Sequence, residues 1–314
     1  MKRKVIKQGH DTLTISLPKI WCKKLNVKGG IEVDVTENGD ELVVNAKERK
    51  EEKKEVTIEI PEMESKTIKF LIRNLYIDGY DNVTINFKKN TAIDFSSKVE
   101  STVLNIIAYE VRRLMGFEIV NTGSNFCHLQ NLSRESIEEF DISLRRSFGI
   151  VNEWWKEIKK ATMSGYNKLP QFGQDMHDQI TKLISYNLRI LNKIGYKDKR
   201  MTLRMFQILY KIDDIIDLIK ECLKETGDKM PFKSKLVLEI TDETSNLFES
   251  ASKLFYKFDF QAFSRSCTKK CELIDKIIDA SSKSSKIERR YLTYLENILE
   301  ELRKLNIARM SLEY

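Results

Sequence analysis

The chain has 314 residues, of which 41% are hydrophobic and 32% charged, with four prolines and twelve glycines. This length exceeds the roughly 100–200 residues of one domain, so we expect two or three cores, and the composition excludes a chain dominated by disorder. No apolar run approaches the ~20 residues that span a bilayer and no apolar segment follows Met1, so we expect a soluble, cytoplasmic protein. Five cysteines without a CxxC pair indicate reduced thiols.

The net charge of +7 is concentrated near the beginning of the chain. Between Met1 and Lys28, eight basic residues accompany a single acid, Asp11. A local basic excess of this kind favours a nucleic-acid partner.

Residues 1–50 are expected to form a small β-rich domain. Polar and apolar residues alternate over 3–17 and 31–45, which predicts short strands. Pro18 can open a helical turn that reaches Leu25, and Gly29-Gly30 and Asn38-Gly39 supply turns. So small a unit buries too little surface to be stable alone, which makes dimerisation by strand exchange attractive.

A small α+β domain is expected over residues 55–131. The charge run Lys47–Glu55 lacks an apolar period and marks the boundary before it. Alternation and helical periodicity then predict four strands and two helices. The strands are Val56–Ile60, Val83–Phe87, Phe117–Val120 and Phe126–Gln130, and the helices are Lys66–Ile77 and Ser96–Met115.

From Ser133 onward, six amphipathic helices are predicted. Their breaks fall near residues 167–173, 195–200, 227–231, 258–259 and 281–285. Short breaks favour antiparallel neighbours, so we expect two antiparallel three-helix bundles, over residues 133–228 and 229–314. The segment Ile212–Asp217 is echoed 83 residues later by Leu295–Glu300, which indicates a repeat.

Three segments of the first domain follow one another in a recognisable order: Lys4-Val5-Ile6-Lys7-Gln8-Gly9, Leu13-Thr14-Ile15-Ser16-Leu17-Pro18-Lys19 and Leu25-Asn26-Val27-Lys28-Gly29-Gly30-Ile31-Glu32-Val33. Over about 45 residues they resemble the AbrB/SpoVT family of swapped hairpins. Gly30 departs from the family, which commonly has Asp there. The resemblance implies a homodimer whose basic face lies on duplex DNA.

Basic side chains on a paired β surface can neutralise DNA phosphates and release counterions. The candidate DNA-binding residues are Lys2, Arg3, Lys4, Lys7 and Lys19, followed by Lys23 and Lys24. Alternatively, these lysines only protect an exposed strand edge.

Carboxylates in the first helical bundle are candidate metal ligands. Asp213, Asp217 and Glu221 share one helix face at i, i+4 and i+8, while Asp175 and Asp178 open the preceding helix. Antiparallel pairing around residue 198 predicts that Asp178 and Asp217 are neighbours. Carboxylates that converge favour hard cations such as magnesium, and iron or zinc could also recruit His177. Alternatively, the acids favour a helix N-terminus or form a solvated stripe.

The segment Lys211-Ile212-Asp213-Asp214-Ile215-Ile216-Asp217 looks like the acid-xxx-Asp motif of PhoU proteins, and residues 133–311 resemble that family's layout. The combination of the first domain with this helical region resembles archaeal PhoU-like regulators. The resemblance implies metal-binding carboxylates and a matching second set. The second set is Glu272, Asp275, Glu296 and Glu300. Two departures from the family are Glu300, where Asp is usual, and Gln174, where an acid is expected.

These observations predict a phosphate-responsive regulator that binds DNA and represses phosphate uptake, and not an enzyme. The phosphate link comes from the resemblance alone. A second hypothesis is a protein whose body docks on a phosphate ABC transporter or a sensor protein, with membrane contact only through such partners. A metal-dependent hydrolase is a third, because clustered metals can activate water.

Overall fold

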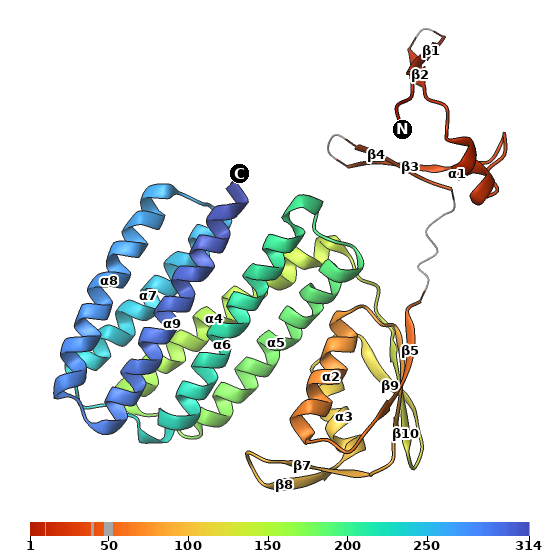
Figure 1. Ribbon diagram of the computed structural model, residues 1–314. Coiled ribbons are helices and arrows are strands. Elements are labelled where there is room, and N and C mark those ends of the chain that lie inside the picture. Colours follow the sequence, from red (N-terminus) through yellow and green to blue (C-terminus); the bar gives the residue numbers. More distant parts are fainter. Residues whose placement is uncertain (10, 39–40, 47–52, 314) are drawn as a thin grey trace. The chain divides into compact units, whose positions relative to one another are not determined.

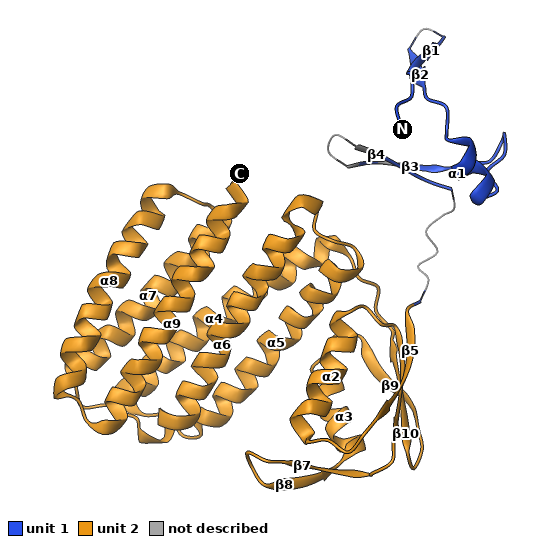
Figure 2. Cartoon of the chain, in the orientation of Figure 1, with its two compact units in different colours: residues 1–53 blue, residues 54–314 orange. Residues whose placement is uncertain are grey.

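A computed structural model describes residues 1–9, 11–38, 41–46 and 53–313, which form two compact units, Met1–Lys53 and Lys54–Tyr314 (Figure 2). The prediction of a β-rich N-terminal region followed by a helical body is confirmed. The turn at Gly39 and most of the predicted linker lie outside the described residues. Among the helices described, none combines the length and apolarity needed to cross a membrane.

The first unit consists of two hairpins with a short helix between them. Each hairpin pairs its strands antiparallel. The helix, α1, begins directly after Pro18, where the sequence predicts it. The elements are β1 (Ile6–Gln8), β2 (Thr12–Thr14), α1 (Lys19–Lys24), β3 (Asp34–Asn38) and β4 (Glu41–Asn45).

The second unit begins with a four-stranded sheet covered on one face by two helices. The strand order is β5-β6-β10-β9, with β5 and β6 parallel and the other neighbours antiparallel. Along β6 and β10 every second side chain is buried, as expected for a sheet with one covered face. The elements are β5 (Glu55–Ile60), α2 (Ser65–Ile77), β6 (Asn82–Phe87), α3 (Val103–Val111), β9 (Phe117–Thr122) and β10 (Phe126–Asn131).

The helix predicted over Ser96–Met115 is wrong at both ends, because α3 covers only Val103–Val111. Its first residues belong to a hairpin of β7 (Thr91–Asp94) and β8 (Val99–Thr102), and only α3 is helical. The Asp94 side chain accepts hydrogen bonds from Ser96 and from the Ser97 backbone N–H, which closes the turn. This local bonding competes with the helix, a property of aspartate that helical periodicity does not register.

Six long helices follow, as the periodicity predicts (Figure 1). Helix α5 packs on α4 and α6, and α7, α8 and α9 pack on one another; α6 against α9 and α4 against α7 join the two sets. The helices are α4 (Ile137–Ser164), α5 (Leu169–Lys193), α6 (Thr202–Thr226), α7 (Lys235–Tyr256), α8 (Phe260–Lys283) and α9 (Lys286–Met310), with short 3-10 turns at Lys199–Met201, Gly227–Lys229 and Ser311–Glu313.

The break predicted near residues 167–173 is shorter than expected. Helix α5 already begins at Leu169, and Gly173 lies inside it. A Cβ atom at Gly173 would lie 3.0 Å from Leu223 Cδ1, so the glycine permits close packing against α6. A glycine that the sequence presents as a helix breaker therefore serves helix packing.

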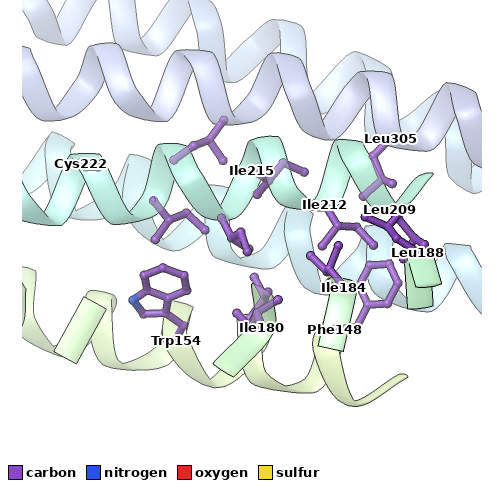
Figure 3. Packing of buried hydrophobic residues seen from close by; sticks show 14 of the residues in the cluster. Phe148, Trp154, Ile180, Ile184, Leu188, Leu209, Ile212, Ile215, Cys222 and Leu305 are labelled. Atoms are coloured by element: carbon purple, nitrogen blue, oxygen red, sulfur yellow. The ribbon is translucent and has the colours of Figure 1, made fainter. Parts of the chain in front are cut away.

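The repeated segments of α6 and α9 form two sides of one core. The apolar positions of both are buried, and the two helices pack against each other. The matched positions are Ile212, Ile215, Ile216 and Ile219 in α6, and Leu295, Ile298, Leu299 and Leu302 in α9. Figure 3 shows Trp154, Ile180 and Ile215 in the core between α4, α5 and α6.

Arg189 of α5 connects the helical body to the sheet layer through hydrogen bonds and ion pairs. Its side chain is fully buried, and its Nη1 donates to the backbone oxygens of Tyr76 at 2.7 Å and Tyr80 at 2.8 Å. Its Nη2 lies 2.5 Å from Asp81 Oδ1, and its Nε pairs with Glu135. Two carboxylates and two carbonyls thus compensate one buried guanidinium, as a buried charge requires.

Candidate functional site

Three of the carboxylates singled out in the sequence, Asp178, Asp213 and Asp217, lie on α5 and α6, and Asp178 contacts α3 and Arg113 of the sheet layer. His177 and Asp178 come from the first half of α5, and Asp213 and Asp217 lie one turn apart on α6. The amphipathic pattern turns the apolar stripes of both helices inward, which leaves these polar positions at the edge of the core. The site therefore gathers residues from segments about 40 positions apart.

His177 bridges the two aspartates that were predicted to be neighbours. Its ring is buried, with Nε2 2.9 Å from Asp217 Oδ1 and Nδ1 3.2 Å from Asp178 Oδ1. Thr181 Oγ1 lies 3.4 Å from Nε2. Both ring nitrogens face carboxylate oxygens, so the ring lies within hydrogen-bond distance of both acids.

Asp178 is held by groups of the sheet layer as well. Arg113 Nη2 lies 2.9 Å from its Oδ1, and the Tyr109 hydroxyl donates to its Oδ2 at 3.1 Å. Gln174 Nε2 donates to Oδ1 at 2.8 Å. Burial opposes ionisation, but the His177 hydrogen bond and the Arg113 charge hold the pKa of Asp178 below its usual value.

A fully buried glutamate, Glu110, pairs with two arginines, one of which also contacts Asp178. Glu110 of α3 accepts from Arg73 Nε at 2.7 Å and pairs with Arg113 Nη1 at 3.3 Å. One carboxylate thus orients two guanidinium groups, one of which reaches Asp178. Sequence reasoning missed Arg73, Tyr109, Glu110 and Arg113; the available signal was the charged triplet Glu110, Arg112 and Arg113 in an otherwise apolar helix.

Asp217 and Asp213 differ in their electrostatics although they are four residues apart. Lys220 Nζ lies 2.5 Å from Asp217 Oδ1 and 3.4 Å from His177 Nε2. Burial disfavours the charged form of Asp217, yet hydrogen bonds with His177 and Lys220 keep its pKa low. At Asp213, burial and the nearby Asp217 charge raise the pKa, so its charge is the less stabilised of the two.

The predicted metal ligands do not form a ready cation site in this arrangement. Within the described part of the chain, no three or more His, Cys, Asp or Glu side chains gather in a way that could hold an ion. Arg113 and Lys220 already supply positive charge to Asp178 and Asp217. Asp175 is exposed and accepts from Gln171, and Glu221 pairs with Lys224. Metal binding by iron, zinc or magnesium stays a prediction. It requires the Arg113 and Lys220 side chains to move away from Asp178 and Asp217.

Two of the four carboxylates in the second set, Glu272 and Glu300, are paired with cations. Glu300 lies 2.8 Å from Lys270 Nζ and 2.5 Å from Arg303 Nη2, which lower its pKa to about 2. Glu272 lies 3.5 Å from Lys269 Nζ. Asp275 and Glu296 are exposed. In both repeats, the carboxylate at the matched position pairs with a basic side chain three residues later, as Asp217 with Lys220 and Glu300 with Arg303.

The predicted DNA-binding residues of the first unit are all exposed. Lys7 lies in β1, and Lys19, Lys23 and Lys24 lie in α1, while the other three precede β1. No ion pair joins any of the seven to a carboxylate within the described part of the first unit. Unpaired cations of this kind remain available for phosphates. The seven are Lys2, Arg3, Lys4, Lys7, Lys19, Lys23 and Lys24.

The residues of this unit that the structure describes do not form a hydrophobic interior. None of its residues with a described side chain is buried. Apolar side chains that alternate along the strands are instead open to solvent, for example Leu13 at 69%, Val35 at 58% and Leu42 at 61%, and Ile20 of α1 is 79% exposed. These side chains need a covering surface, since apolar area of this extent is rarely left in water.

Comparisons of the chain with family models, with curated proteins and with solved structures each gave no match.

Proposed function

We propose that the protein is a DNA-binding regulator in which two copies of the first unit form one basic, β-rich head. The observation that carries this proposal is the absence of any buried side chain among the described residues of that unit, together with its unpaired cations. A second copy that adds its strands would cover the apolar side chains and join two basic surfaces. The swapped-hairpin arrangement and the contact with duplex DNA belong to this proposal.

In the proposed protein, the helical body supplies the regulatory signal. The pairings of α4–α6 and of α7–α9 support a division into two three-helix bundles, with α6 and α9 as their matching elements. The cluster around His177 joins this body to the sheet layer that follows the head in sequence. The identity of the signal as phosphate, and the repression of phosphate uptake, rest on the resemblance to PhoU proteins.

A second candidate function has its own supporting observation. An open hollow of about 580 Å³ lies between α6 and α9, and its lining holds four carboxylates and one lysine: Asp214, Asp217, Glu221, Glu301 and Lys220. The carboxylates outnumber the lysine, so the lining suits a basic segment of a partner, such as a transporter subunit or a sensor protein, that displaces their present lysine partners. In that case the head only dimerises. The metal-dependent hydrolase stays a third hypothesis.

Genome-wide DNA occupancy with and without phosphate tests the proposal. The DNA-binding regulator predicts discrete sites whose occupancy changes with phosphate. Absence of sites, combined with recovery of a transporter ATPase in a pull-down, would favour the docking protein instead.

A further inference from the structure

A hollow of about 380 Å³ lies in the sheet layer beside helices α2 and α3 and the β7–β8 hairpin. Its lining includes Lys69 of α2 and Arg112 just after α3, and Ser97 of the hairpin turn. This hollow is separate from the carboxylate cluster, although Tyr109 takes part in both.

The two cations of the hollow have no carboxylate partner within the described residues. Lys69 Nζ lies 4.7 Å from the centre of the Tyr109 ring, and Arg112 Nε donates to the backbone oxygen of Ala108 at 3.2 Å. The acid in the lining, Asp94, is committed to the hairpin turn. Its hydrogen bonds with Ser96 and the Ser97 backbone lower its pKa to about 2. The lining of the hollow thus contains two cations, and one carboxylate that already accepts hydrogen bonds from the hairpin turn.

Neutral hydrogen-bonding groups complete the lining. The side chains of Ser97, Ser101 and Asn105 face the hollow and have no hydrogen-bond partner within the protein residues described. Val99 and Ile106 are the aliphatic residues of the lining; Val99 is 55% exposed and Ile106 is buried. Cations with neutral donors suit a phosphate group, while apolar contacts suit an organic group attached to it.

We propose that this hollow binds a phosphorylated small molecule of mononucleotide size, with its phosphate on Lys69 and Arg112 and its organic part against Val99 and Ile106. The volume lies within the roughly 300–1,000 Å³ of small-molecule sites, and exceeds what a bare phosphate ion fills. Arginine and lysine are the usual phosphate-binding side chains.

The site has a direct connection to the carboxylate cluster. The Tyr109 ring lies under Lys69, and its hydroxyl donates to Asp178. A phosphate that draws Lys69 away from the ring changes the contacts of a residue that also holds Asp178. A regulatory role for this connection rests on the proposed function, whereas ligand binding itself does not.

Isothermal titration of the full chain with adenosine monophosphate tests the proposal. We expect saturable binding, which Lys69→Gln and Arg112→Gln each weaken at least tenfold. Lys88→Gln is the matched control, because Lys88 is exposed and pairs with Glu59 at 3.0 Å. Adenosine and inorganic phosphate should each bind at least tenfold more weakly than the monophosphate. Circular dichroism verifies that the variants are folded.

Failure of adenosine monophosphate to bind, or equal binding by the wild type and both variants, would overturn the assignment. Equal affinity for adenosine or for inorganic phosphate would also overturn it, because the proposed ligand needs both of its parts. DNA binding measured without nucleotide distinguishes the two proposals. A chain that binds DNA but not the monophosphate refutes the hollow and leaves the proposed function standing.

Discussion

Arg113 Nη2 lies 2.9 Å from Asp178 Oδ1, so a guanidinium of the sheet layer pairs with a carboxylate of the helical body. Glu110 holds the same arginine from behind, and His177 and Tyr109 hold the same aspartate. A network of charged side chains thus connects the sheet layer with the helical body, and it includes residues that the sequence analysis predicts to bind metal.

Arg113→Ala should lower the free energy of unfolding by about 1–3 kcal/mol, because buried Glu110 and half-buried Asp178 each lose a charged partner. Arg146→Ala should change it by less than about 0.5 kcal/mol, since Arg146 is exposed. Chemical denaturation measures both. Equal effects would mean that the contact between the layers contributes no stability.

Arg189→Met should destabilise the protein by about 3–5 kcal/mol, because it leaves Asp81 and Glu135 buried and without their guanidinium. Arg146→Met controls for the substitution itself. The midpoint of urea unfolding reports the difference. An Arg189→Met variant as stable as the Arg146→Met control would contradict the structural role given to Arg189.

Asp213→Asn should stabilise the protein at pH 7, raising the thermal midpoint by a few degrees, on the order of 2–4 °C. The pKa of Asp213 is raised in the folded state, so its charge costs stability above that pKa. The cost disappears as pH falls through the folded pKa toward the unfolded one. The variant's advantage should therefore vanish at acidic pH.

Asp178 provides the opposite pH dependence. Its folded pKa is lowered, so its stabilisation is complete above the unfolded pKa and is lost as pH falls through the folded pKa. Asp178→Asn should therefore destabilise at pH 7 and lose its effect in acid. Thermal melts from pH 3 to pH 7 compare the two variants, and parallel profiles would contradict the assignment.

Lys220→Met should increase zinc binding roughly tenfold, or about 1.4 kcal/mol. The lysine ammonium lies against Asp217 and His177, where it competes with a cation. Lys224→Met is the matched control, because Lys224 pairs with Glu221 one turn along the helix. Equilibrium dialysis with elemental analysis measures the uptake. Tight binding by the wild type, unchanged in the variant, would show that Lys220 is no competitor.

Apart from the β7–β8 hairpin, the order of helices and strands in the second unit could be predicted, because hydrophobic periodicity indicates which faces are buried. The segment Ile212–Asp217 of α6 and its repeat Leu295–Glu300 of α9 are an example, because the apolar residues of both segments are buried as the periodicity predicts. The β7–β8 hairpin could not be predicted, because Asp94 directs it through its own hydrogen bonds. Helix geometry is enough to predict that Asp178 and Asp217 lie near each other, but the intervening His177 and the arginines contributed by the sheet layer depend on tertiary packing.

Fluorescence anisotropy of the full chain with labelled duplex DNA tests the central claim most directly. Exposed cations on a dimeric head predict binding whose affinity falls linearly with salt on logarithmic axes, and Lys7→Ala with Lys19→Ala should reduce that slope. No binding at low salt, or an affinity that does not change between low and moderate salt, would contradict the account.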